Sequence, residues 1–303
     1  MYFKPGERFP LDSALKYLMV KSANDVAVAI GEAVSGTEEA FVAEMNSAAR
    51  LLGMNSSRFV NPNGLPGDGQ YTTVRDMALL AVALRREFPE FAHYFAYEGF
   101  TTGKKSYTNY NLLVGRFRDA DGMKTGFICA SGFNQVSSAT RNGKTVVSVV
   151  FGAPSQEARV EESARLLQKA LTTTAWGGAS LQTLAPYGEG RDQVADISGE
   201  ICTAKARAAR YEGRDVEGKM VLNSPYLTEM TREPRLVQAP AGLPRASVEI
   251  ALSRIPIPVP RPGTTLAGQV EPFAASAFTA PAQAAEMLPL RPGVPIPVPR
   301  PEI

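Results

Sequence analysis

Asp121-Gly122-Met123-Lys124-Thr125-Gly126-Phe127 predicts a β-strand that can hold a peptide-like ligand ending in a carboxylate. Lys124 supplies a compact cation, and Thr125 places a hydroxyl beside it. Gly126 has no Cβ, so the backbone of a ligand can approach the strand closely at that point. Three residues of these common types also occur together by chance. The weight of the triplet therefore depends on what the rest of the chain contains.

Composition excludes several classes of protein. The chain has 303 residues and a formal net charge of +2, without a long Lys/Arg run, so nothing indicates a nucleic-acid partner. No apolar run reaches the roughly 18 residues that a membrane-spanning helix requires. The first residues, Met1 to Gly6, lack the apolar core of a signal peptide and read like the middle of a domain.

Histidine and cysteine are scarce, which restricts the chemistry further. The one histidine, His93, lies among aromatic residues and is interpreted as part of a packing surface, so multi-histidine metal sites are excluded. The only cysteines, Cys129 and Cys202, are too few for a thiolate zinc site. Cys129 is typical of a small buried apolar residue, and a disulfide with Cys202 stays open for an oxidising compartment.

The first half of the chain predicts four helices. Asp12 is expected to cap the first, which should end near Lys21, and a second follows at once and runs to Gly36. Thr37 is expected to cap the third, and Thr72 or Thr73 the fourth. The fourth helix is expected to bury one face, which consists of Met77, Leu80 and Leu84.

The stretch that follows the fourth predicted helix indicates hairpins and one long helix. Residues 97–111 indicate a hairpin, and residues 132–140 and 144–152 indicate another, whose Asn142-Gly143 suits a tight turn. Ser155 should then cap a helix that turns Val160, Ala164, Leu167 and Leu171 toward a core.

The chain divides into three expected regions. Residues 1–175 read as a folded domain, residues 176–250 as a low-periodicity linker, and residues 251–303 as a Pro-rich tail that is largely disordered. The tail repeats Ile-Pro-Val-Pro-Arg-Pro, a motif that favours polyproline II and serves as a spacer or, less favoured, as a partner-binding segment.

Two motifs now stand in order, Ser22-Ala23-Asn24 between helices and Lys124-Thr125-Gly126 on a strand. Together with Ser-x-x-Lys they form the motif set of serine penicillin-recognising enzymes. The flanking runs resemble most closely the D-alanyl-D-alanine carboxypeptidases of the peptidase S11 type, over roughly residues 1–175. These flanks are Lys21–Asp25, Asn61–Leu65, Gly69–Thr73 and Arg75–Ala78.

The resemblance implies an α+β fold, an antiparallel sheet flanked by helices in the penicillin-binding/β-lactamase manner. It implies that Ser22 relays a proton and that Asn24 donates its amide to a substrate carbonyl and accepts from a lysine ammonium. Lys124 and Thr125 would bind the terminal carboxylate of a peptidoglycan stem pentapeptide, and Gly126 would complete the substrate-binding motif by letting the peptide backbone approach. It also implies a periplasmic location, β-lactam antibiotics as inhibitors, no metal or cofactor, and a possible tether to a membrane or partner outside this fold. Taken alone, the first motif is typical of a helix-end cap and the second of a solvated strand end.

The nucleophile of such enzymes is the serine of Ser-x-x-Lys. Ser13-Ala14-Leu15-Lys16 fits that pattern as text. Ser13 and Ser22 lie nine positions apart on one predicted helix, or roughly 13 Å at 1.5 Å per residue, which is beyond relay distance. We therefore expect Ser13 to be structural, the N-terminal part of the fold to be missing, and this chain to be inactive. The alternatives are a non-catalytic peptidoglycan- or penicillin-binding module or inactive fragment, and a β-lactamase.

Overall fold

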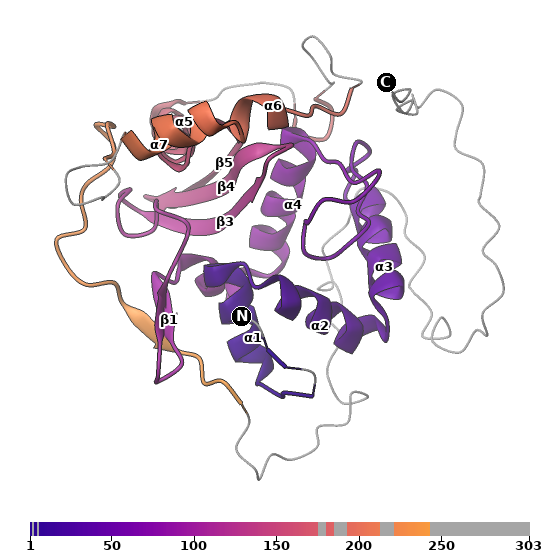
Figure 1. Ribbon diagram of the computed structural model, residues 1–303. Helices are drawn as coiled ribbons and strands as arrows, with labels where there is room; N and C mark the ends of the chain where they lie inside the picture. Colours follow the sequence, from indigo (N-terminus) through magenta and orange to yellow (C-terminus); the bar gives the residue numbers. More distant parts are fainter. Residues whose placement is uncertain (2, 5, 175–179, 185–192, 213–220, 243–303) are drawn as a thin grey trace. The chain divides into compact units, whose positions relative to one another are not determined.

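The computed structural model describes residues 1, 3–4, 6–174, 180–184, 193–212 and 221–242 (Figure 1). The chain separates into two compact units, one of residues 1–186 and 195–248 and the other of residues 187–194 and 249–303. Almost all of the second unit lies outside the described residues, and so do both Pro-rich repeats. The description that follows concerns the first unit.

Three helices open the fold: α1 (Leu11–Lys21), α2 (Asn24–Ser35) and α3 (Glu38–Leu51). The predicted end of α1 is confirmed, and Thr37 caps α3 by accepting from the backbone N–H of Ala40 at 3.1 Å. The predicted Asp12 cap is wrong, because Pro10 precedes α1 and Asp12 lies within its first turn. There its carboxylate accepts from Lys16 instead.

One antiparallel sheet has the strand order β3 (Ala120–Ile128), β4 (Gly132–Arg141) and β5 (Lys144–Ala153). The turn between β4 and β5 is the expected one: Asn142 and Gly143 both have positive φ values, 52° and 76°, which a two-residue turn matching the strand twist requires. Because β3 forms one edge of this sheet, its outer backbone groups have no strand partner among the described residues.

Helices cover both faces of this sheet (Figure 1). Helix α5 (Gln156–Thr172), capped by Ser155 as predicted, packs against the face that carries Val146. Helix α4 (Val74–Glu87), capped by Thr73, packs against the face that carries Val147. The predicted inner face of α4, Met77, Leu80 and Leu84, is only half-buried, and the most buried residues are Asp76, Leu79 and Ala81. The expected helix-flanked antiparallel sheet is confirmed.

A second sheet has the order β2 (Ser106–Thr108), β1 (Gly99–Thr101) and β6 (Leu236–Gln238), and the 3-10 helix η1 (Pro89–Ala96) precedes it. The β1–β2 hairpin is the predicted one. Strand β6 comes from far along the chain and pairs parallel to β1, with Phe100 opposite Val237. Phe100 and Tyr17 are fully buried in the core beneath.

Ordered structure therefore continues beyond residue 176. Helices α6 (Ser198–Ile201) and α7 (Ala204–Glu212) and strand β6 lie in the stretch expected to be a linker. The expectation of a linker without regular structure is wrong for these parts, and β6, for example, is held by its pairing with the distant β1, which leaves no local periodicity. The division of the chain near residues 175 and 250 stays a prediction. In the part of the chain that the structure describes, no helix is long and apolar enough to span a bilayer.

Candidate functional site

The site begins where α1 ends. Ser22 follows the last residue of α1 and has left-handed backbone angles, φ 54° and ψ 49°, and its N–H donates to Leu18 O. This reversal is short, since Asn24 already begins α2. It holds the Ser22 side chain at the junction of two helices, a position fixed by both.

Lys124 joins this junction to the edge strand β3. Its ammonium donates to Ser22 Oγ at 2.7 Å and to Thr125 O at 2.7 Å. The structure thus brings together two of the predicted site residues that are 102 positions apart in the chain. Thr125 lies half-buried next to Lys124, and Gly126 is exposed.

Asn24 is placed differently. Its side chain is exposed at the start of α2 and makes no hydrogen bond among the described residues, so it does not accept from the Lys124 ammonium here. An exposed amide beside Ser22 remains available to a ligand. Gly126 shows a similar openness, because a Cβ built on it would meet only Asn134 Cβ, at 3.9 Å.

Burial sets the electrostatics of Lys124. Removal from water, together with the smaller effect of the nearby Arg159 guanidinium, lowers its pKa from 10.5 to about 8. A buried ammonium that is hydrogen-bonded only to neutral oxygens favours the approach of an anion. The arrangement is therefore suited to bind a carboxylate.

Arg159 on α5 is a cation that the sequence analysis missed. It is 4% exposed, its guanidinium donates to Tyr110 O at 3.3 Å and to Asn134 O at 3.5 Å, and its Nε has no partner among the described residues. Burial lowers its pKa to about 10, against the opposing effect of Glu157. The available signal was its position beside Val160 on the predicted inner face of α5.

Asp121 anchors the beginning of β3. Its carboxylate accepts two bonds from Arg85 on α4, at 2.9 and 2.8 Å, and one each from Ser138 and Thr140 on β4, both at 2.6 Å. A bidentate ion pair of this kind fixes orientation as well as distance. It ties the strand that carries Lys124 to the helix beneath the sheet.

Residues 1–155 match the peptidase S11 family, described as D-alanyl-D-alanine carboxypeptidase. The chain belongs to this family. It is 36% identical over 187 residues to D-alanyl-D-alanine carboxypeptidase DacC of Escherichia coli, which covers 61% of this chain and 45% of that protein. The chain thus spans about half the length of the curated relatives it matches.

Solved structures of the family show the same fold. The D-alanyl-D-alanine carboxypeptidase DacD from Francisella tularensis is 33% identical, with a TM-score of 0.54, over 57% of this chain and 54% of that one. Penicillin-binding protein D2 from Listeria monocytogenes, solved in an ampicillin-bound form, is 32% identical, with a TM-score of 0.51, over 54% of this chain and 68% of that one. The resemblance to S11 carboxypeptidases predicted from the motifs is confirmed.

In the Ser-Ala-Leu-Lys run, the side chains of Ser13 and Lys16 are occupied by contacts within the fold. Ser13 is fully buried in the core with Tyr17, and Lys16 donates to Asp12 Oδ2 at 2.5 Å and to Gln238 O at 2.9 Å. Among the described residues, neither side chain hydrogen-bonds to Ser22 or Lys124. These contacts agree with the expectation that Ser13 is not a nucleophile.

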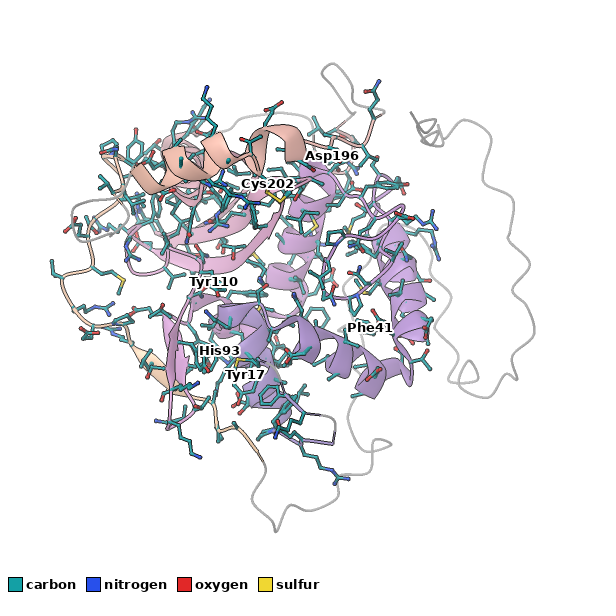
Figure 2. The ribbon with its side chains drawn as sticks, in the orientation of Figure 1. Tyr17, Phe41, His93, Tyr110, Asp196 and Cys202 are labelled. Carbon is teal, nitrogen blue, oxygen red and sulfur yellow. A yellow bond between two sulfur atoms is a disulfide. The ribbon has the colours of Figure 1, made fainter. Side chains whose placement is uncertain are left out.

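His93 and the cysteines complete the account of the predicted residues (Figure 2). The His93 ring packs on Tyr94 and Tyr97, with centroid distances of 4.4 and 5.7 Å, as expected of a packing surface. Cys129 and Cys202, which the sequence left open, form a disulfide. It joins the residue after β3 to the residue after α6.

Proposed function

We propose that this protein binds peptides ending in D-Ala-D-Ala. The terminal carboxylate would lie at Lys124 and Thr125, and the peptide backbone would lie along the open edge of β3. The observation that carries the proposal is the Lys124–Ser22 contact, which places a buried cation beside a hydroxyl at an unpaired strand edge. The names of the curated relatives support this choice of peptide.

We also propose that this site serves a serine-type carboxypeptidase that removes the terminal D-alanine of peptidoglycan stem peptides in the periplasm. Ser22 would accept from Lys124 and pass a proton to the leaving amine, since one hydroxyl can donate and accept together. An acyl-serine intermediate needs a nucleophile. The sole Ser-x-x-Lys among the 303 residues is Ser13–Lys16, whose burial argues against that role.

Labelled penicillin and a D-Ala-D-Ala peptide test this proposal on the 303-residue chain. We expect reversible peptide binding by calorimetry and no covalent label after denaturation. A covalent label that disappears in Ser13→Ala would show that Ser13 is the nucleophile, which contradicts the proposal that this chain is inactive. A folded chain that binds no peptide would contradict the carboxylate site itself.

A non-catalytic binding module is the second candidate function. It is favoured by the same Lys124–Ser22 contact, together with the burial of Ser13 in the Ser-x-x-Lys run. Hydrolysis of the labelled penicillin by a high concentration of the chain distinguishes a binding module from a β-lactamase, because a β-lactamase would hydrolyse the penicillin in many turnovers. We expect no turnover.

A further inference from the structure

Strand β5 forms the second edge of the β3–β4–β5 sheet, on the side away from the strand that carries Lys124 (Figure 1). It is 10 residues long, and among the described residues it pairs with β4 alone. A long strand at the edge of a sheet presents a row of backbone N–H and C=O groups to its surroundings. The proposed function uses the β3 edge and gives the β5 edge no role.

The register of the β4–β5 hairpin determines which backbone groups of β5 face outward. Its two-residue turn makes Arg141 and Lys144 the closing pair, and such a pair exchanges both of its hydrogen bonds. Groups that face β4 then recur at every second residue after Lys144. The residues between them, whose backbone N–H and C=O point away from β4, are Thr145, Val147 and Val149.

These outward-facing groups are unpaired and accessible. In the part of the chain that the structure describes, no hydrogen bond reaches the backbone N–H or C=O of Thr145, Val147 or Val149. Thr145 is exposed and the two valines are half-buried, so the helices that cover the faces of the sheet leave this edge open. Such groups are satisfied by water or by another strand.

The β5 edge lacks the features that ordinarily prevent strands from pairing. Charges, prolines and bulges along an edge protect it. β3 carries Asp121 and Lys124 and has a register shift near Gly122. In β5, by contrast, no charged residue and no proline occurs from Thr145 to Ala153, and the register shift lies beyond Val150.

The side chains of β5 are already held in place by the two helices. Val146 packs in the core with residues of α5, and Val147 and Val149 pack in the core with residues of α4. The strand therefore has its extended conformation before any partner arrives. Pairing along this edge requires little further ordering, which removes much of the entropic cost of association.

We propose that β5 pairs antiparallel with β5 of a second copy of this chain, which joins the two three-stranded sheets into one. The edge is self-complementary about Val147, which faces its own counterpart, while Thr145 faces Val149 of the second copy. Each of these pairs exchanges two hydrogen bonds, so the three pairs form about six. Because this stretch carries no charge, no like charges oppose one another across the twofold axis.

A second copy fits this edge because the contact closes on itself. Pairing about a twofold axis uses the β5 edge of both copies, and both outer edges of the joined sheet are then β3. The charges and the register shift of β3 oppose further addition, so association should end at the dimer. The interface is narrow, which predicts a weak dimer in the micromolar range. This inference is independent of the proposed function, since the β3 edge stays free.

Sedimentation and hydrogen exchange of the full chain test the dimer and its location. Sedimentation velocity should show a monomer–dimer equilibrium. Residue-resolved amide exchange then compares two sets of amides in one strand. Exchange of the outward-facing amides of Thr145, Val147 and Val149 should slow as the protein concentration rises. The amides that face β4 should be protected equally at every concentration; they belong to Val146, Ser148 and Val150.

Two substitutions at one exposed position provide a matched pair. Thr145→Pro and Thr145→Val both lose the 2.9 Å hydrogen bond between the hydroxyls of Thr140 and Thr145. Proline also removes the outward-facing N–H, without removing a bond to β4. Because the twofold axis repeats the loss, Thr145→Pro should weaken the dimer about tenfold or more. Thr145→Val should dimerise like the wild type.

Three outcomes would overturn the inference. The first is a wild type that stays monomeric at the highest concentration that can be reached. The second is a dimer in which exchange of the outward-facing amides does not depend on concentration, since that dimer forms through another surface. The third is protection of those amides in the monomer, which would mean that a strand of the same chain covers the edge. If Thr145→Pro does not fold, the exchange of the wild type decides alone.

Discussion

Two serine–lysine combinations lie close together in this protein and have opposite characters. Ser13 and Lys16 are three positions apart on α1, yet Ser13 is buried in the core and Lys16 is paired with Asp12. Ser22 and Lys124 are 102 positions apart, yet their side-chain atoms lie 2.7 Å from each other. The first pair matches a catalytic motif as text, and the second is assembled only by the fold.

Lys16 and Lys124 differ in the hydrogen-bond partners of their ammonium groups. Lys16 has a carboxylate, which satisfies its charge within the protein. In the part of the chain that the structure describes, Lys124 donates only to neutral oxygens, and burial and Arg159 both lower its pKa. A cation that has no carboxylate partner among the described residues is available to a ligand, whereas a cation paired with a carboxylate stabilises the fold.

The largest effect is expected from removing the Lys124 cation. Lys124→Met should weaken binding of a D-Ala-D-Ala peptide about tenfold to a hundredfold, because a charged hydrogen bond contributes about 1.5–3 kcal/mol. The melting temperature should not fall, since a desolvated charge is removed as well. Calorimetric titration with the peptide should compare Lys124→Met with Lys105→Met, in which an exposed lysine is replaced. Equal affinities in the two variants would contradict the assignment.

The pH dependence of binding should come next in size. Lys124 has a pKa of about 8, so below that pH it is charged and should bind a carboxylate, and above it the affinity should decline, by up to about tenfold per pH unit. A bound carboxylate favours the proton, so the decline extends between the free and the bound pKa. Titrations from pH 6.5 to 9.5 would show it. A flat profile, or the same decline in Lys124→Met, would count against it.

The same group predicts the sign of a stability change. Between pH 8 and 10.5 the folded protein loses the Lys124 proton while the unfolded chain keeps it, so the contribution of this group to stability should rise with pH. The contribution of Lys124 is the difference between the free energies of unfolding of the wild type and of Lys124→Met, measured with a denaturant at each pH. A difference that shrinks over this range would reverse the sign and refute the burial argument.

A smaller effect, and on stability alone, is expected at Lys16. Lys16→Met loses the bonds to Asp12 and to Gln238 O and should lower the free energy of unfolding by about 1 kcal/mol or less. Peptide affinity should equal that of the wild type. Reduced affinity without reduced stability would mean that Lys16 takes part in the site.

The smallest effect is expected at Ser13. Ser13→Ala removes a neutral buried hydroxyl and should change the free energy of unfolding by about 1 kcal/mol at most. Binding of the peptide should be unchanged. Loss of peptide binding or of penicillin labelling in this variant would remove the contrast between the two pairs.

Most of the structure that could be predicted from the sequence depends on interactions between residues that are close in the chain. Thr37, Thr73 and Ser155 cap helices with their own hydroxyls, and Asn142-Gly143 closes its hairpin, because each device acts within a few residues. Asp12 misled because an acidic residue suits both the cap position and the first turn. The motif residues Ser22 and Lys124 were found for another reason, their resemblance to a family.

What the sequence could not predict depends on distant partners. Three-residue strands such as β6 have no periodicity, and β6 exists because β1 offers it a free edge. Arg159 looked like one charged residue of a helix, and only the packing of α5 on the sheet buries it.

The Cys129–Cys202 bond makes residues 129–202 a covalent ring, with a sequence separation of 73. Strands β4 and β5 and helix α5 all lie inside it. A protease that cuts the backbone once within this ring cannot release either product, because strand β3 stays attached through the disulfide to the residues that follow Cys202. Such a nicked protein would migrate as one chain until a reductant is added, and only then as two.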